Sequence, residues 1–129
     1  MKAGPRPTAG ELAILRVLWA RGPSTVRDVH AELDRERPMG YTTVLKLLQI
    51  MTEKGLVTRD ESARAHVYAP AVEESQTQRR LVRDLLDRAF GGSAAKLVMH
   101  ALAGRKASRD EIASIRRLLD QLERDGGQR

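Results

Sequence analysis

The sequence predicts a mainly α-helical fold with one small β-hairpin. Hydrophobic residues make up 41% of the 129 residues but aromatic residues only 3%, so the core has to be built from leucine, valine, isoleucine and alanine. Such a composition suits helices better than a large β-sandwich. Apolar residues recur at helical spacing along most of the chain, and short runs of β-formers appear only around residue 60.

The first two predicted helices are marked by their caps. Helix one begins at Thr8, with Glu11 three residues later as a capping box, and ends at Gly22-Pro23. Ser24 or Thr25 caps helix two, which ends within the RERPMG segment because a residue before proline avoids helical geometry. The buried stripe expected in helix one is Leu12, Leu15, Leu18 and Trp19.

The third predicted helix runs from an N-cap at Gly40 to about Lys54 and has an unusual outward face. Its apolar stripe is Val44, Leu47, Leu48 and Met51. At about 100° per residue, Thr42, Lys46, Gln49 and Glu53 point the other way. Threonine is a poor helix former at an exposed site, so this face is expected to serve a purpose other than contact with water.

The remaining elements are a hairpin and three further helices. A β-hairpin is predicted from two short segments rich in β-formers, LVTRD and AHVYA, which flank the polar tip ESAR. Helices follow over 73–90, after Ser93, and after Ser108, where Glu111 holds the capping-box position. Left-handed caps are expected at Gly22, Gly55, Gly91, Gly104 and Gly126. The break at residues 69–71 predicts two domains, 1–71 and 72–129.

The order helix, helix, turn, helix, hairpin predicts a winged helix-turn-helix, whose second motif helix enters the DNA major groove. The predicted DNA-binding residues are Tyr41, Thr42, Thr43, Lys46 and Gln49 on the helix, and Arg59 and Arg64 on the wing. The net charge of +6 and the pI of about 10.3 favour a polyanionic partner, nucleic acid before an acidic membrane, although a solubilising charge without a partner is the alternative. Together with the segment order, they predict double-stranded DNA as the partner. For the helix taken alone, an ordinary amphipathic surface explains the residues equally well.

The helical region after residue 72 predicts a dimer. About 60 residues bury too little surface for a good core of their own, yet each helix has an apolar stripe. Pairing with a second copy would cover these stripes, and a two-fold axis would place two recognition helices on one DNA face. The predicted contacts are Leu81, Leu85, Leu97, Ile112, Ile115, Leu118, Leu119 and Leu122. The alternative is a monomer in which this half packs back onto the winged helix.

Several classes of site are not expected. The chain has no cysteine, which removes disulfides, thiolate metal sites and cysteine nucleophiles. His30, His66 and His100 lack metal-ligand spacing, so neither a metal nor another cofactor is predicted. No phosphate loop or nucleophile elbow appears, so an enzyme is not expected. Without an apolar signal core or membrane span, we expect a soluble, cytoplasmic protein.

Four segments together resemble the penicillinase repressor family, the BlaI/MecI/CopY type. They are LRVLWARGPSTVRDVHAEL, YTTVLKLLQIMTEKGLVTRD, RAHVYAPAV and RDLLDRAFGGSAAKLV. The resemblance implies a homodimeric winged-helix repressor on an inverted-repeat operator, often controlling β-lactamase or related resistance genes. The copper-sensing branch of the family carries a cysteine-rich metal motif, and without cysteine that copper site is absent here.

The resemblance also implies inactivation by proteolysis downstream of a membrane sensor peptidase. In related repressors the sensitive bond lies in the short helix that corresponds to residues 96–104, commonly at Asn-Phe. This sequence has His100-Ala101 at that point, which puts the cut site in doubt. Two other functions remain open: a ligand-responsive winged-helix regulator, and a helical adapter that binds proteins and not DNA.

Overall fold

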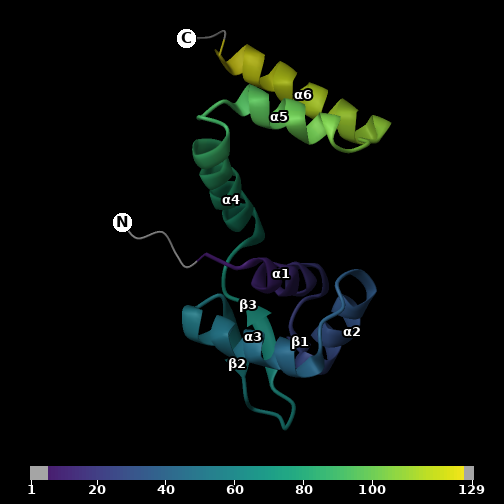
Figure 1. Ribbon diagram of the computed structural model, residues 1–129, viewed down its shortest axis with the longest axis vertical. Coiled ribbons are helices and arrows are strands. Elements are labelled where there is room, and N and C mark those ends of the chain that lie inside the picture. Colours follow the sequence, from purple (N-terminus) through teal and green to yellow (C-terminus); the bar gives the residue numbers. More distant parts are fainter. Residues whose placement is uncertain (1–5, 127–129) are drawn as a thin grey trace. The chain divides into compact units, whose positions relative to one another are not determined.

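The computed structural model describes residues 6–126, apart from the side chains of residues 34 and 36. Its elements are α1 (Ala9–Arg21), β1 (Ser24–Thr25), α2 (Val26–Glu36), α3 (Tyr41–Lys54), β2 (Val57–Asp60), β3 (Val67–Pro70), α4 (Glu74–Ala89), α5 (Ala94–Ala103) and α6 (Arg109–Gly126), labelled in Figure 1. The predicted fold class, mainly helical with a small β-hairpin wing, is confirmed.

The chain divides into two compact units, Met1–Arg80 and Leu81–Arg129, whose boundary falls inside α4. The first unit continues past residue 71 because the segment after β3 is tied to α1 and to the core. The Trp19 indole Nε1 donates a hydrogen bond to the Val72 carbonyl at 3.1 Å, and Val72 packs against the buried cluster. The assignment of 1–71 and 72–129 to DNA binding and dimerisation stays a prediction.

The first unit encloses the hydrophobic core. Helix α1 packs on α2, α3 and β3, and α2 packs on α3. The buried cluster is Ile14, Leu15, Leu18, Val26, Val29, Leu33, Val44, Leu48, Met51, Leu56, Val57 and Tyr68. Leu12, expected in this core, is only partly buried, because α1 turns Ile14 inward in its place.

The capping box predicted for α1 forms, and the cap of α2 is a capping box as well. The Thr8 hydroxyl accepts a hydrogen bond from the Glu11 amide at 3.3 Å, and the Glu11 carboxylate accepts one from the Thr8 amide at 2.8 Å. For α2 the cap is Thr25 and not Ser24, since Thr25 exchanges the same pair of bonds with Asp28. Each box satisfies two amides that the first turn of a helix leaves unpaired.

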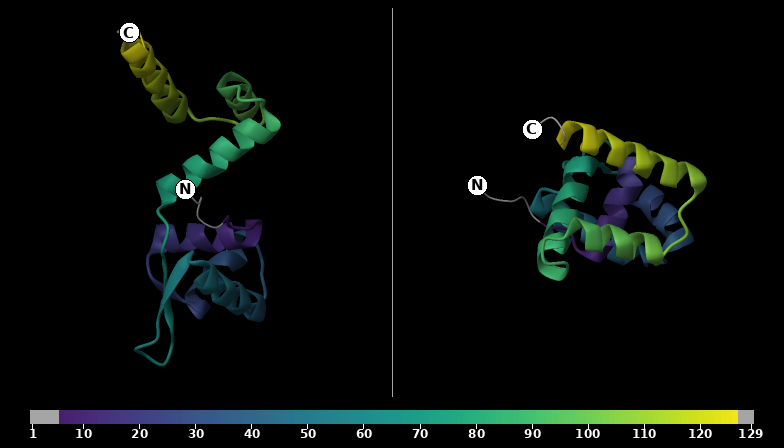
Figure 2. Two further views of the ribbon diagram at one scale, coloured as in Figure 1. Left: turned by 90° about the vertical axis from the view of Figure 1, so that its left-hand side faces the viewer. Right: turned by 90° about the horizontal axis from the view of Figure 1, so that it is seen from above.

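The sheet has three strands in the order β1-β3-β2, and both pairings are antiparallel. The predicted hairpin is the pair β2–β3, and its connecting loop extends beyond the helices of the first unit (Figure 2). The third strand, β1, was not predicted, because it has only two residues, Ser24 and Thr25, and these also begin α2.

Glycines end some of the helices, but not all in the expected way. Gly55 caps α3 in the left-handed region (φ 83°, ψ 16°), where a side chain would be strained. The tight turn between α4 and α5 likewise uses positive φ at Gly91 and Gly92. Gly22 ends α1 with a positive φ but an extended ψ (φ 93°, ψ −172°). Gly104 is right-handed (φ −83°, ψ −11°) and Gly126 is the last residue of α6, so the prediction of left-handed caps was wrong for these three.

The second unit contains the end of α4 together with α5 and α6. Ser93 caps α5 by accepting the Lys96 amide at 3.2 Å, and Ser108 accepts the Glu111 amide at 3.0 Å at the start of α6. Among the described residues, α5 and α6 bury no side chain. The second unit therefore lacks the enclosed core that the first unit has.

Candidate nucleic-acid interface

Helix α3 has a buried face and a polar face. Val44, Leu48 and Met51 are fully buried, which turns the opposite side of the helix to solvent. The predicted DNA-reading residues of α3 are all exposed: Tyr41, Thr42, Thr43, Lys46 and Gln49. The structure thus places these five residues on one accessible surface, while their contact with bases stays a prediction.

The start of α3 favours an anion. Its N-cap, Gly40, offers no side-chain hydrogen bond, and the first turn holds no acidic residue. The amides of that turn and the positive end of the helix dipole are therefore open to a phosphate group. The Tyr41 ring is held edge-on by His30 of α2, with ring centroids 5.7 Å apart at 75°, and it stays 49% exposed.

A depression of about 650 Å³ lies where the starts of α2 and α3 meet the wing. It is lined by Thr25, Val26, Arg27, Tyr41, Leu45, Arg64, Ala65, His66 and Tyr68. Two arginines and a histidine thus surround the exposed Tyr41 at the edge of the α3 surface. This arrangement suits a phosphate of the DNA backbone.

Arg27 and His66 were not predicted as DNA-binding residues. Arg27 lies in the first turn of α2, next to the Thr25 cap. A cation is unfavourable there because the helix dipole already makes that end positive. An arginine in the first turn of a helix was therefore the feature of the sequence that could have identified Arg27 as a candidate DNA-binding residue.

The two predicted wing arginines differ in their surroundings. Arg64 is exposed and lines the depression, and no ion pair involves it among the described residues. Arg59 instead donates from Nε to the Glu61 carboxylate at 3.0 Å. The structure therefore brings Arg64, but not Arg59, together with the start of α3.

A partly buried ion pair fixes α3 against α1. Lys54, the last residue of α3, donates to the Glu11 carboxylate at 2.7 Å, and Glu11 is only 2% exposed. Burial alone would raise the pKa of Glu11, but the hydrogen bonds from Lys54 and Thr8 and the charge of Lys54 outweigh it, so the pKa lies below its ordinary value. The pair holds the C-terminal end of α3.

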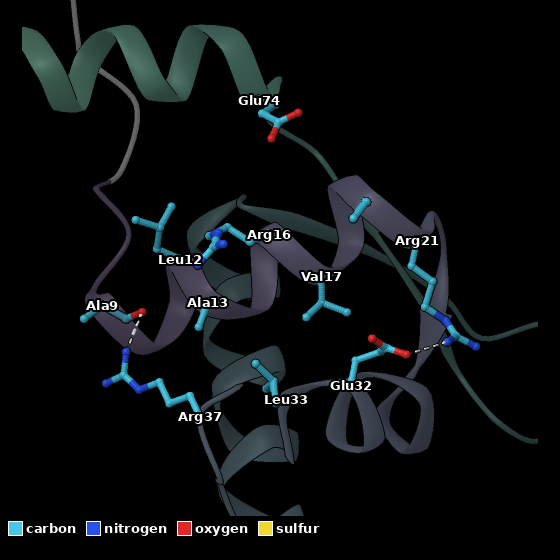
Figure 3. A pocket seen from close by; sticks show the side chains of 11 residues that line it. Ala9, Leu12, Ala13, Arg16, Val17, Arg21, Glu32, Leu33, Arg37 and Glu74 are labelled. Atoms are coloured by element: carbon cyan, nitrogen blue, oxygen red, sulfur yellow. Dashed lines mark hydrogen bonds and ion pairs between the residues drawn. The ribbon is translucent and has the colours of Figure 1, made fainter. Parts of the chain in front are cut away.

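A second hollow, of about 780 Å³, runs along α1 and the end of α2 (Figure 3). It contains none of the predicted DNA-binding residues. Some of the polar groups on its walls have partners within the first unit. Arg21 pairs with Glu32 at 3.6 Å, and Arg37 donates to the Ala9 carbonyl at 3.3 Å. Arg16 and Glu74 also line the hollow, and the ligand-responsive alternative stays untested by these contacts.

The predicted dimerisation residues all lie in the second unit, which begins at Leu81 within α4. Leu85, Ile112, Leu118, Leu119 and Leu122 are between 41% and 57% exposed, and Leu81, Leu97 and Ile115 are half-buried. His100 and Ala101, the possible cleavage region, are exposed on α5. So many large apolar side chains left in solvent are unusual for a monomer in water.

Within residues 6–126, no group of three histidine, aspartate or glutamate side chains is placed to hold a metal ion. No described helix is long and apolar enough to cross a membrane.

Comparison with known proteins gave concordant results along nearly the whole chain. The family model described as Penicillinase repressor matches residues 7–121. The Transcriptional regulator BlaI of Mycobacterium tuberculosis is 36% identical over 121 residues, covering 92% of this chain and 86% of the relative. The Penicillinase repressor of Bacillus licheniformis is 24% identical over 121 residues, covering 94% of each.

Two solved structures resemble the first part of the chain. The solution structure of the DNA-binding domain of the repressor BlaI is 27% identical, covers 58% of this chain and 92% of that chain, and has a TM-score of 0.51. The Bacillus licheniformis BlaI monomer in complex with the blaP half-operator is also 27% identical, with the same coverage and a TM-score of 0.50.

Proposed function

The chain belongs to the penicillinase repressor family, and we propose that it is a transcriptional repressor that binds an inverted-repeat operator as a homodimer. The observation that carries the proposal is the exposed polar face of α3 beside the depression lined by Arg27 and Arg64. A related BlaI was solved on a half-operator, which supports DNA as the ligand of this surface.

In the proposed complex, α3 lies in the major groove. Lys46 donates to guanine, Gln49 pairs with adenine, and the threonine methyl groups contact thymine. A backbone phosphate lies in the depression, where Tyr41, Arg27 and Arg64 reach it together with the open amides of α3. Phosphate contacts fix the register, and the residues of α3 then select the sequence.

The exposed leucines of the second unit support the homodimer. Leaving Leu118, Leu119 and Leu122 more than half exposed forfeits about half of the free energy that their burial would provide. A second copy offers the same apolar faces, and a two-fold axis matches the symmetry of an inverted repeat. Linking the first units of two protomers raises the affinity for paired half-sites without any new contact to the DNA.

The regulated genes are proposed from the relatives. One relative is named Penicillinase repressor, and others, from staphylococci, are named Methicillin resistance regulatory protein MecI. We therefore propose control of β-lactamase or related resistance or stress genes. The DNA upstream of the protein's own gene is the first place to look for the operator.

Release from DNA is proposed to occur by cleavage within α5, near His100-Ala101, by a sensor peptidase or a protease downstream of it. A cut there would detach α6 with Ile112, Leu118 and the other leucines, each worth about 1.5–3 kcal/mol when buried. The core of the first unit lies within residues 14–68 and would be left intact. The separated first units would each bind a half-site only weakly.

A protein truncated after Met99 tests this release mechanism. It is expected to keep a folded first unit and weak DNA binding, but to lose dimerisation and tight operator binding. A truncated protein that dimerises and binds the operator like the intact chain would contradict the mechanism.

Binding of labelled DNA tests the proposed function itself. Duplexes from upstream of the gene and a shuffled duplex of equal length are titrated with the protein at several salt concentrations. We expect one upstream segment to bind more tightly than the shuffled duplex, with affinity on both falling as salt rises. Equal affinity for every duplex would argue against an operator-binding repressor.

A further inference from the structure

We propose that Glu61 is the counter-ion that holds Arg59 on the wing, so that it limits the affinity for non-specific DNA and leaves Arg64 as the DNA-facing arginine of the hairpin. The inference rests on the proposed function, since it assigns roles within the same DNA-binding surface. It also replaces the sequence-based expectation that Arg59 and Arg64 act alike.

Arg59 is held from two sides within the wing. Its Nε donates to the Glu61 carboxylate at 3.0 Å, which is both a hydrogen bond and an ion pair. Across the hairpin, Arg59 lies opposite Tyr68, which is 1% exposed. The neighbouring Tyr68 side chain and then the Glu61 charge raise the pKa of Arg59. The arginine side chain is 31% exposed against 56% for the glutamate, so the cation is the more covered partner.

Arg64 has the opposite situation at the other end of the loop. It is exposed, lines the depression beside Tyr41 and Arg27, and has no ion pair among the described residues. A long, unpaired arginine next to the open start of α3 can reach a phosphate without first breaking another contact. The wing thus carries one engaged and one available arginine.

The pairing matters because affinity for non-specific DNA is almost wholly electrostatic. Each phosphate that a protein neutralises adds about 0.9 to the slope of log affinity against log salt. Arg59 and Glu61 together carry no net charge, so the pair adds nothing to this slope while it stays closed. Releasing Arg59 would let it neutralise a phosphate in any register, and would therefore strengthen binding to any sequence.

The salt dependence of binding to a random-sequence duplex of about 30 base pairs tests the roles of both arginines. Between roughly 50 and 200 mM salt, Glu61→Gln is expected to steepen the slope by about 0.9 for each wing that touches DNA, and Arg64→Gln to flatten it by the same amount. The decisive protein is the double variant Arg59→Gln with Glu61→Gln, which exchanges one neutral pair for another. Its slope should equal that of the wild type.

Asp60→Asn is the matched control, because it removes one negative charge from the same loop without releasing an arginine. Asp60 accepts the Ser62 amide at 2.9 Å, a turn bond that asparagine also makes. Its slope should change less than that of Glu61→Gln. Circular dichroism establishes that each variant is folded, and the double variant keeps the test decisive if Glu61→Gln alone disturbs the wing.

A double variant whose slope is flattened as much as that of Arg64→Gln would overturn the inference, since Arg59 would then be a DNA contact. Equal slopes for Glu61→Gln and Asp60→Asn would overturn it as well, because only overall charge would matter. The proposed function fails separately, if the wild-type protein shows no salt-dependent binding to any duplex.

Discussion

Replacing both Leu118 and Leu119 with glutamate is expected to convert the protein from dimer to monomer. The two side chains are 57% and 56% exposed in the single chain, so a partner can still bury about half of each. Full burial of a leucine is worth about 1.5–3 kcal/mol, so half burial gives about 0.8–1.5 kcal/mol. Four such leucines meet in a two-fold dimer and together contribute about 3–6 kcal/mol.

This loss would weaken dimerisation by about two to four powers of ten, since 1.4 kcal/mol corresponds to a factor of ten. The four introduced carboxylates add repulsion and the cost of removing charge from water. Sedimentation velocity at micromolar concentration is expected to show a dimer for the wild type and a monomer for the variant. Operator affinity should fall together with the dimer.

The control variant carries the same added charge off the leucine stripe, at Ser114→Glu and Gln121→Glu, two exposed positions of α6. It is expected to remain dimeric. A wild-type protein that sediments as a monomer at micromolar concentration would refute the reasoning, and so would a Leu118 and Leu119 variant that still dimerises.

Two further predictions concern the first unit. Lys46→Ala and Gln49→Ala are each expected to cost about 1–3 kcal/mol on the operator and much less on random DNA; equal losses on both would count against base reading. Glu11→Gln is expected to lower the free energy of unfolding at neutral pH by about 1–3 kcal/mol, less than for a fully buried pair because Lys54 is 31% exposed. Because the pKa of Glu11 lies below 4.5 in the folded protein, this advantage of the wild type is complete above that pH and is lost as the pH falls through the lowered value. Urea unfolding followed by the fluorescence of Trp19 measures the difference, and a difference that stays constant down to about pH 3 would contradict the assignment.

The sequence was most informative where a local rule has one outcome. The spacing of Thr8 and Glu11 predicted a capping box. The helical spacing of Val44, Leu48 and Met51 predicted which side of α3 faces solvent. The same periodicity failed on α1, where Leu12 was expected in the core in place of Ile14. That helix is apolar on more than one side, so spacing alone cannot select the buried face.

Features that depend on contacts between distant segments could not be predicted. The strand β1 exists because Ser24 pairs with Tyr68, far along the chain. The meeting of Arg27 with Arg64 and His66 follows from the same closure of the sheet. The contact of Arg59 with Glu61 is local, but its geometry depends on the hairpin register, which places Arg59 opposite Tyr68. The roles of the α3 residues and of the leucine stripe stay predictions.

Footprinting of the DNA around the protein's own gene tests the central claim most directly, because it reports sequence selection and symmetry together. A dimeric repressor with two α3 helices is expected to protect two half-sites that form an inverted repeat, with centres about 10 base pairs apart or a multiple of that distance. Protection of a single half-site without a symmetric partner, or no protected segment at protein concentrations that bind random DNA, would contradict it.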